Sequence, residues 1–207
     1  MKKQLAFVVE LDRCIGCKGC QVACKMENDV PLGSDRIKVY QVGPFGEFPD
    51  LSMYFLPTMC QQCADPVCVR VCPTTAITKS SKDGVVTIDT DKCIGCQSCN
   101  KKCPYHVNTY STSRNVMDKC TLCIASRQDN EQPACIRNCT GKALHYGDIS
   151  DLTGSDDGTG FALAKVTDAA SVTGAINSVK LELNSGIGAN KKIDIMSIID
   201  DILTANM

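Results

Sequence analysis

The chain has 207 residues, a formal net charge of −1 and 43% hydrophobic residues. These values are typical of an ordinary globular protein and exclude a nucleic-acid-binding surface of high positive charge. The longest apolar run is far too short to cross a membrane, so any membrane association is expected to depend on a partner. The unusual feature is the count of sixteen cysteines, all of which fall into four groups of four.

The first cysteine group follows a short N-terminal segment. Its members, Cys14, Cys17, Cys20 and Cys24, read C-x2-C-x2-C-x3-C. Bacterial ferredoxins use this run to bind a cubane iron-sulfur cluster. The apolar residues before the group are interrupted at Glu10, which is unlike a secretory signal peptide.

Residues 25–59 separate the first group from the second. Segments 36–42 and 51–56 read RIKVYQV and LSMYFL, which have the composition of strands. The sequence GPFG at residues 43–46 predicts a turn between them. We therefore predict a hairpin insertion at about residues 25–59 that covers the cluster region.

The second and third groups are separated by twenty residues, 73–92. This link contains a Lys82-Asp83-Gly84 turn followed by an alternating strand at 85–89. The third group repeats the spacing of the first, and DRCIGC at 12–17 recurs as DKCIGC at 91–96. The link is therefore predicted to join two halves of one ferredoxin unit.

The cysteine spacing predicts which thiols share a cluster, because in two-cluster ferredoxins the fourth cysteine of each run binds the other cluster. For the second and third groups, this rule predicts one cluster on Cys60, Cys63, Cys68 and Cys103, and another on Cys93, Cys96, Cys99 and Cys72. By elimination, the first and fourth groups are expected to pair. They would hold one cluster on Cys14, Cys17, Cys20 and Cys139, and another on Cys120, Cys123, Cys135 and Cys24.

The predicted fold class is α+β, with two nested ferredoxin-like units that carry two 4Fe-4S clusters each. The outer unit comprises residues 1–59 and 104–149, and the inner unit comprises residues 60–103. Residues 150–207 are expected to form a polar linker and a C-terminal extension. In the extension, an apolar stripe predicts an amphipathic helix that packs either on this chain or on a partner: Ile195, Ile198, Ile199, Ile202 and Leu203.

Zinc and disulfides are the alternative uses of clustered cysteines. Zinc sites use two cysteine pairs and have no use for the third cysteine of a tight triplet. A disulfide framework suits a short secreted chain. Proline follows the fourth cysteine at Cys72-Pro73 and Cys103-Pro104, as in the ferredoxin run, and this further favours iron-sulfur clusters.

Nine basic residues lie within or beside the cysteine groups. A cubane bound by four thiolates is a net anion, so nearby cations influence its reduction potential. For any single basic residue, a solvated surface charge is the simpler interpretation. As a set they are expected to offset cluster charge: Arg13, Lys18, Lys25, Arg70, Lys92, Lys101, Lys102, Lys119 and Arg137.

The whole pattern resembles the beta subunits of dimethyl sulfoxide reductase-type molybdopterin oxidoreductases. The resemblance covers roughly residues 5–150 and rests on the four groups, their order, the x4 spacing from Cys63 to Cys68, the gap from Cys123 to Cys135, and CPYHVNTYSTSRNVMDKC. Similar subunits serve dimethyl sulfoxide, thiosulfate, polysulfide, tetrathionate and arsenate reductases in anaerobic respiration. The resemblance implies a non-catalytic subunit that docks on a large catalytic subunit with molybdenum or tungsten bis-pterin, and that relays single electrons to or from a membrane anchor, a quinone-reactive subunit or a soluble partner.

The resemblance also implies an order for the clusters. The cluster of Cys14 would lie nearest the catalytic subunit, followed by the clusters of Cys120, Cys93 and Cys60. Some members of the family have tryptophan in place of the second cysteine of the third group and hold a three-iron cluster there. Because Cys96 is present, we expect four cubanes.

Other functions are left open by the sequence. The chain also fits a free-standing polyferredoxin, or the electron-transfer subunit of a formate dehydrogenase or hydrogenase. It contains no hydrolytic triad, phosphate loop or dinucleotide fingerprint, so no catalysis is expected of it alone. It is expected to be a peripheral subunit, either exported with its partner to the periplasmic face or cytoplasmic. The substrate and the direction of electron flow depend on the partner.

Overall fold

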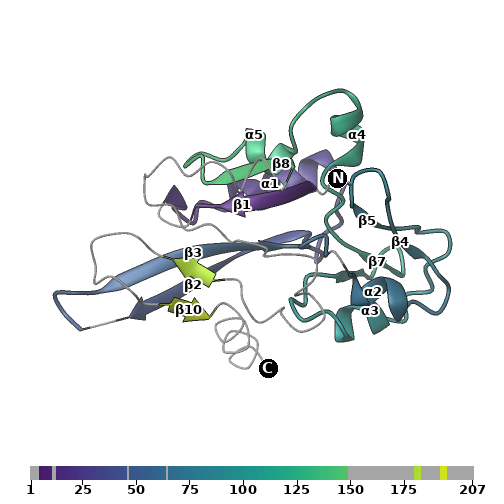
Figure 1. Ribbon diagram of the computed structural model, residues 1–207, viewed down its shortest axis with the longest axis horizontal. Helices are drawn as coiled ribbons and strands as arrows, with labels where there is room; N and C mark the ends of the chain where they lie inside the picture. The colour runs from purple at the N-terminus through teal and green to yellow at the C-terminus, as the bar shows by residue number, and fades with distance from the viewer. Residues whose placement is uncertain are drawn as a thin grey trace.

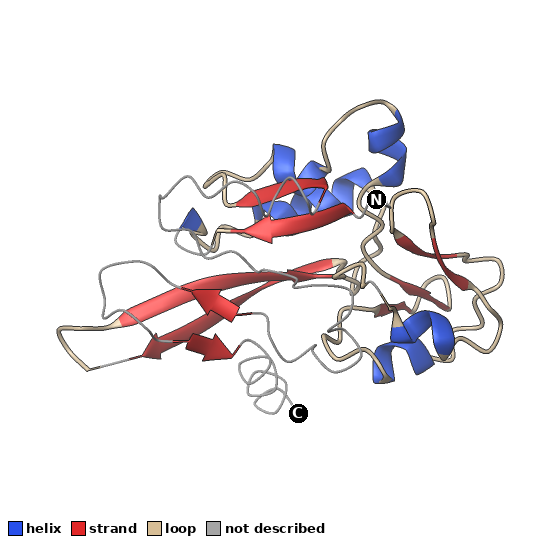
Figure 2. Ribbon diagram, in the orientation of Figure 1, coloured by secondary structure: helices blue, strands red, loops and turns tan. Residues whose placement is uncertain are grey.

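The computed structural model describes residues 5–10, 13–45, 47–63 and 65–148, together with two short strands, β9 (Lys180–Glu182) and β10 (Lys192–Asp194). Short helices and two-stranded antiparallel sheets alternate along the chain (Figure 2). The mixed helix and strand content agrees with the predicted α+β class. Most of the predicted linker and the apolar stripe at residues 195–203 lie outside the described residues.

The first and last strands of the cysteine region pair with each other. β1 (Leu5–Val9) runs antiparallel to β8 (Leu144–Asp148), with Leu5 opposite Asp148 and Val9 opposite Leu144. Figure 1 shows the two strands side by side near α1 (Gly19–Glu27). This pairing brings together segments more than 130 residues apart in the sequence.

Three further helices accompany the fourth and second cysteine groups. α4 (Ile124–Gln128) and α5 (Ala134–Arg137) follow Cys123 and Pro133, and α5 packs against α1. α2 (Val67–Arg70) contains Cys68. It packs against α3 (Ser98–Lys101), which contains Cys99.

The link between the second and third groups forms a short hairpin. β4 (Ile77–Lys79) pairs with β5 (Val86–Ile88), so that Ile77 faces Ile88 across the sheet. The strand predicted after the Lys82-Asp83-Gly84 turn is therefore confirmed. Gly84 has φ of +73°, a conformation that costs glycine little because it lacks a Cβ.

A longer hairpin occupies the predicted insertion. β2 (Ile37–Phe45) pairs with β3 (Ser52–Met59) and extends away from the other elements as an arm (Figure 1). The position predicted for its turn is wrong, because β2 continues to Phe45 through a register shift after Val42. The turn instead lies closer to Asp50, whose N–H donates to the Glu47 carbonyl.

One hairpin was not expected from the sequence. β6 (Thr109–Ser111) pairs with β7 (Val116–Asp118) between the third and fourth groups. Each strand is only three residues long, and the segment is too polar to show strand periodicity. Within the described part of the chain, no helix is long and apolar enough to span a membrane.

The cysteines themselves form part of the buried core. Cys20, Cys24 and Cys135 pack with Ile37 and Leu144 between α1, α5 and the base of the long hairpin. A second cluster gathers Cys99 with apolar residues of β4, β5 and β7. Because the core is built around thiol groups, the fold is organised by its candidate ligands.

Candidate iron-sulfur cluster sites

The loops of the first and third groups share one backbone design. Gly16 and Gly95, which occupy equivalent places in the repeat, have φ of +66° and +65°. Lys18 and Gln97 then adopt left-handed conformations just before α1 and α3. Each loop therefore turns sharply between its second and third cysteines, and the third cysteine enters the first turn of a helix.

The first candidate site is a cavity of about 340 Å³. Its lining includes the thiol-bearing residues Cys14, Cys17, Cys20 and Cys139. Burial raises the pKa of Cys20 to about 11, and the nearby thiolates of Cys14, Cys139 and Cys17 add to this rise. A backbone donor is also present, because the Ala143 N–H lies 3.2 Å from the Cys139 sulfur.

A second set of neighbouring thiols lies between α1, α4 and α5. Burial raises the pKa of Cys24 to about 12, with added contributions from Cys120 and Cys123. Burial also raises the pKa of Cys135, and the thiolates of Cys120, Cys123 and Cys24 act in the same direction. The Asn28 amide lies 3.8 Å from the Cys24 sulfur and 3.6 Å from the Cys123 sulfur, so it can donate to either thiolate.

A third set surrounds Cys63. Burial raises the pKa of Cys63 to about 12, and the thiolates of Cys60, Cys103 and Cys68 add to this rise. The Lys79 ammonium donates to the Cys63 carbonyl at 2.8 Å and to the Gly84 carbonyl at 2.9 Å. This set therefore has a partly buried cation beside it.

The fourth set contains Cys99, Cys93, Cys96 and Cys72. Burial raises the pKa of Cys99 to about 11, and Cys93 and Cys96 are among the thiolates that add to this effect. The pKa of Cys96 is lowered, chiefly by a hydrogen bond with the Ser98 hydroxyl, although the Cys72 thiolate opposes the shift. The Met117 N–H of β7 lies 3.4 Å from the Cys93 sulfur.

The raised pKa values describe thiols that are protonated at neutral pH when nothing is bound. Metal ligation requires thiolates, so binding at these sites would release protons. Within the described residues, which include all sixteen cysteines, no three His, Cys, Asp or Glu side chains converge on a point where one metal ion would bind. The thiolates of a cubane bind separate iron atoms and need not converge in that way.

Contacts between sets define their order in space. Cys20 of the first set acts on Cys135 of the second, Cys60 of the third acts on Cys120, and Cys68 acts on Cys99 of the fourth. The Cys60 set therefore lies next to the Cys120 set, and the order that the resemblance implied for the last two is wrong. The spacing rule groups thiols but does not say which half of the inner unit faces the outer one.

Solvent exposure follows the same order. Cys17 of the first set and Cys96 of the fourth are the two exposed cysteines. Each follows an exposed isoleucine of the repeated loop, Ile15 or Ile94. The two middle sets are made of buried or half-buried cysteines. An electron could therefore enter or leave most directly at the two ends.

Most of the predicted basic residues are surface charges with acidic partners. Arg13, Lys25, Arg70, Lys92 and Arg137 each pair with a carboxylate. Lys119 is the exception among the nine, since its side chain is only 1% exposed. The simpler interpretation is thus correct for these five paired residues and wrong for Lys119.

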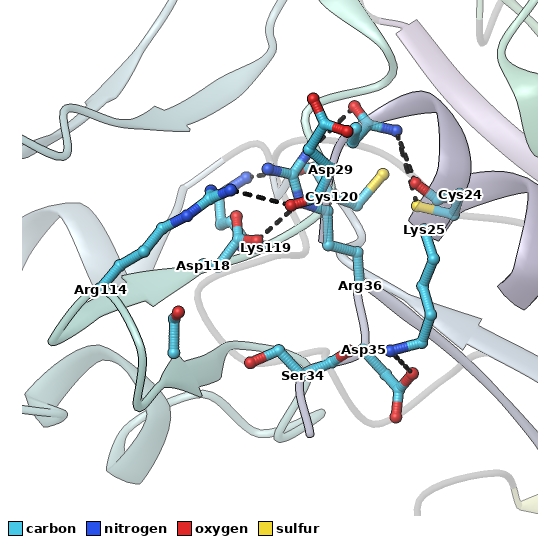
Figure 3. Close-up of polar contacts among 12 residues, drawn as sticks. Cys24, Lys25, Asp29, Ser34, Asp35, Arg36, Arg114, Asp118, Lys119 and Cys120 are labelled. Atoms are coloured by element: carbon cyan, nitrogen blue, oxygen red, sulfur yellow. Dashed lines mark hydrogen bonds and ion pairs between the residues drawn. The ribbon is translucent and has the colours of Figure 1, made fainter. Parts of the chain in front are cut away.

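Sequence reasoning missed a buried network beside Cys24. Arg36 of the hairpin insertion donates from Nε to Asp118 at 2.8 Å and from Nη1 to the Asn28 amide oxygen at 3.0 Å. Figure 3 shows the Arg36 and Asp118 side chains meeting beside Lys119 and Cys120. The Arg36 charge lowers the pKa of Cys24, against the larger effect of burial. Arg36 is twelve residues from the nearest cysteine in sequence, so only the fold reveals its place.

Comparisons with known proteins agree with this geometry. Residues 51–149 match the family model of the 4Fe-4S dicluster domain. A putative iron-sulfur subunit of dimethyl sulfoxide reductase from Halobacterium salinarum is 36% identical, with 74% of this chain and 68% of the relative aligned. An iron-sulfur relative from the tetrathionate reductase of Salmonella typhimurium is 38% identical over 72% of this chain and 60% of its own. A probable anaerobic dimethyl sulfoxide reductase chain of Escherichia coli, YnfG, is 36% identical over 73% and 77%.

Proposed function

Because the chain belongs to the iron-sulfur electron-transfer subunits of dimethyl sulfoxide reductase-type molybdopterin oxidoreductases, we propose that it carries four 4Fe-4S clusters and relays single electrons. Its partners would be a large catalytic subunit with molybdenum or tungsten bis-pterin and a quinone-linked or soluble redox protein. The chain itself would perform no group transfer. It would act as a peripheral, partner-associated subunit.

The observation that carries this proposal is the arrangement of the sixteen thiols. They lie in four sets of mutual neighbours, and each set combines cysteines from two groups distant in sequence. These sets support the following ligands: Cys14, Cys17, Cys20 and Cys139; Cys24, Cys120, Cys123 and Cys135; Cys60, Cys63, Cys68 and Cys103; Cys72, Cys93, Cys96 and Cys99. The β1–β8 pairing supports the division into an outer unit closed around an inner one.

When bound, each cluster accepts and releases one electron at a time. The chain holds the clusters in a row, with burial around the two middle sets and exposed cysteines at both ends. Backbone N–H groups near Cys93, Cys120 and Cys139 are placed to donate to ligating sulfurs, which tunes the potential of a cluster. These features fit transfer through the protein rather than chemistry at an open pocket.

The proposal is tested by anaerobic purification from native cells under conditions that preserve complexes. We expect about sixteen irons per chain, four for each of four cubanes, together with molybdenum or tungsten on a large companion. Iron without either metal would instead support the polyferredoxin, formate dehydrogenase or hydrogenase alternatives. Zinc in place of iron would contradict the proposal.

A further inference from the structure

Lys119 occupies the joint between the two middle sets of thiols. Its side chain is 1% exposed, and its ammonium donates to the Val86 carbonyl and, at 2.8 Å, to the Cys120 carbonyl. Val86 belongs to β5 of the inner segment, whereas Cys120 belongs to the fourth cysteine group. The ammonium therefore bridges the two parts of the fold.

The carboxylate next to Lys119 in sequence is already engaged elsewhere. Asp118 pairs with Arg36 through Oδ2 at 2.8 Å, and its other oxygen accepts the backbone N–H of Lys119. Among the ion pairs of the described residues, none involves the Lys119 ammonium. Two carbonyl dipoles are weak compensation for a buried charge, which is costly unless an anion lies nearby.

The anionic groups that feel Lys119 belong to two different sets. Its charge acts on the thiolates of Cys68 and of Cys120, where it lowers the pKa against the opposing effect of burial. Cys68 is a proposed ligand of one middle cluster and Cys120 of the other. A single cation thus lies within electrostatic reach of both.

We propose that Lys119 is a charge-compensating residue shared by the two middle clusters, which raises the reduction potential of both at the point where an electron crosses between the inner and outer units. This inference rests on the proposed function. A fixed cation stabilises the reduced, more negative form of a cluster more than the oxidised form. Each transfer oxidises one cluster by one electron and reduces its neighbour by one, so a cation that acts on both keeps the two potentials in step.

A buried polar network holds Lys119 in this position. Gln62, which is 2% exposed, accepts the Val86 N–H at 2.8 Å and donates to the Cys120 carbonyl at 3.0 Å. The Cys120 carbonyl therefore receives both the Gln62 amide and the Lys119 ammonium. The network fixes the ammonium relative to both middle sets.

Lys79 provides a matched comparison. Its ammonium is partly buried and bonds the Cys63 carbonyl, and the thiolates that act on it are those of Cys63 and Cys60. It is therefore placed beside only one middle set. The exposed Lys38 of β2 serves as the control for removing one positive charge from the surface.

The test is a redox titration of each variant in the complex as purified, followed by electron paramagnetic resonance. Lys119→Gln removes the charge but keeps an amide donor for the two carbonyls, and Lys119→Met also removes the donor. We expect both variants to keep the iron content of the unaltered protein and to lower two of the four midpoint potentials. Lys79→Met should lower one potential, and Lys38→Met should lower none.

Full iron content with four unchanged potentials in Lys119→Gln would overturn the inference, and so would a shift of only one. If both neutral variants lose iron, Lys119→Arg decides the question. Recovery of the iron in Lys119→Arg supports the charge, whereas equal loss in all three variants assigns Lys119 a packing role and overturns the inference. An unaltered protein without about sixteen irons would instead contradict the proposed function itself.

Discussion

The backbone of Gly16 lies directly under the ring of Phe55: a Cβ added at Gly16 would come 2.4 Å from the ring carbon Cδ1. The equivalent Gly95 faces a different hairpin, where a Cβ would come 2.5 Å from the Asn115 carbonyl oxygen. The two hairpins, β2–β3 and β6–β7, thus cover equivalent loops of the cysteine repeat. The repeated glycine serves hairpin packing in both places.

Gly95→Ala is expected to be more damaging than Gly16→Ala. Both substitutions force a Cβ onto a positive-φ residue, which costs roughly 1–2 kcal/mol. At Gly95 the obstacle is backbone, while at Gly16 the Phe55 side chain can move aside. Gly33→Ala is the matched control, since Gly33 has φ of +82° but nothing within 4 Å of the added Cβ. The measurement is the temperature at which each variant loses half its cluster absorbance, and equal midpoints for all three variants would contradict the steric argument.

The Arg36–Asp118 pair gives a second prediction. Both side chains are largely buried, so Arg36→Met leaves the Asp118 carboxylate without its cation and beside the Cys24 set. Breaking a buried pair in this way costs about 3 kcal/mol. We expect a lower denaturant midpoint and a lower potential for the Cys24 cluster. The double variant Arg36→Met with Asp118→Asn should recover much of the stability, and no recovery would show that the ion pair is not the source of the effect.

The contrast between Arg36 and Lys119 shows how far the sequence reaches. Cysteine spacing predicts the groups, the repeat and the link hairpin, because these depend on local chain geometry. The location of Lys119 among nine basic residues gives no sign that it alone is 1% exposed, since burial depends on how two distant halves meet. Arg36 shows no signal at all, because its role arises from a hairpin that folds back from the insertion.

The order of the clusters failed for a related reason. Spacing indicates that Cys72 and Cys103 each cross to the neighbouring half of the inner unit, but both orientations of that unit satisfy the rule. The contact between Cys60 and Cys120 depends on tertiary packing instead. The short hairpin β6–β7 was missed because three-residue strands carry too little periodicity to stand out.

A third prediction concerns pH. Burial raises the pKa of Cys24 and Cys63 from 9.0 to about 12 in the cluster-free fold. A thiol with a raised pKa contributes stability that is present below its unfolded pKa and is lost as the pH rises toward the folded value. The cluster-free chain should therefore weaken between about pH 9 and pH 12, whereas thiolates already bound to iron do not titrate in this range.

We expect the stability difference between loaded and cluster-free protein to widen from pH 8 to pH 10. The measurement is urea unfolding followed by circular dichroism, with and without removal of iron by a chelator. A cluster-free chain that no longer folds at pH 10 represents the largest form of this difference. Parallel pH profiles for the two forms would contradict the prediction.

The exposure of Cys17 and Cys96 predicts which thiols react first when the clusters are destabilised. Both are exposed and lie at opposite ends of the row of sets, whereas Cys24, Cys123 and Cys135 are buried. A thiol released from iron at an exposed position meets solvent and reagent at once. A buried thiol also has a raised pKa, as at Cys24, and so presents little of the reactive thiolate.

Brief alkylation during controlled exposure to air, followed by mass spectrometry, should therefore label Cys17 and Cys96 well before the three buried cysteines. Full unfolding in denaturant supplies the control, because all sixteen thiols should then react at similar rates. Early labelling at Cys24 or Cys135 would mean that the middle sets open to solvent before the ends do. In that case the ends could not be the points where electrons enter and leave by virtue of their exposure, and the route through the protein would have to be assigned from the potentials alone.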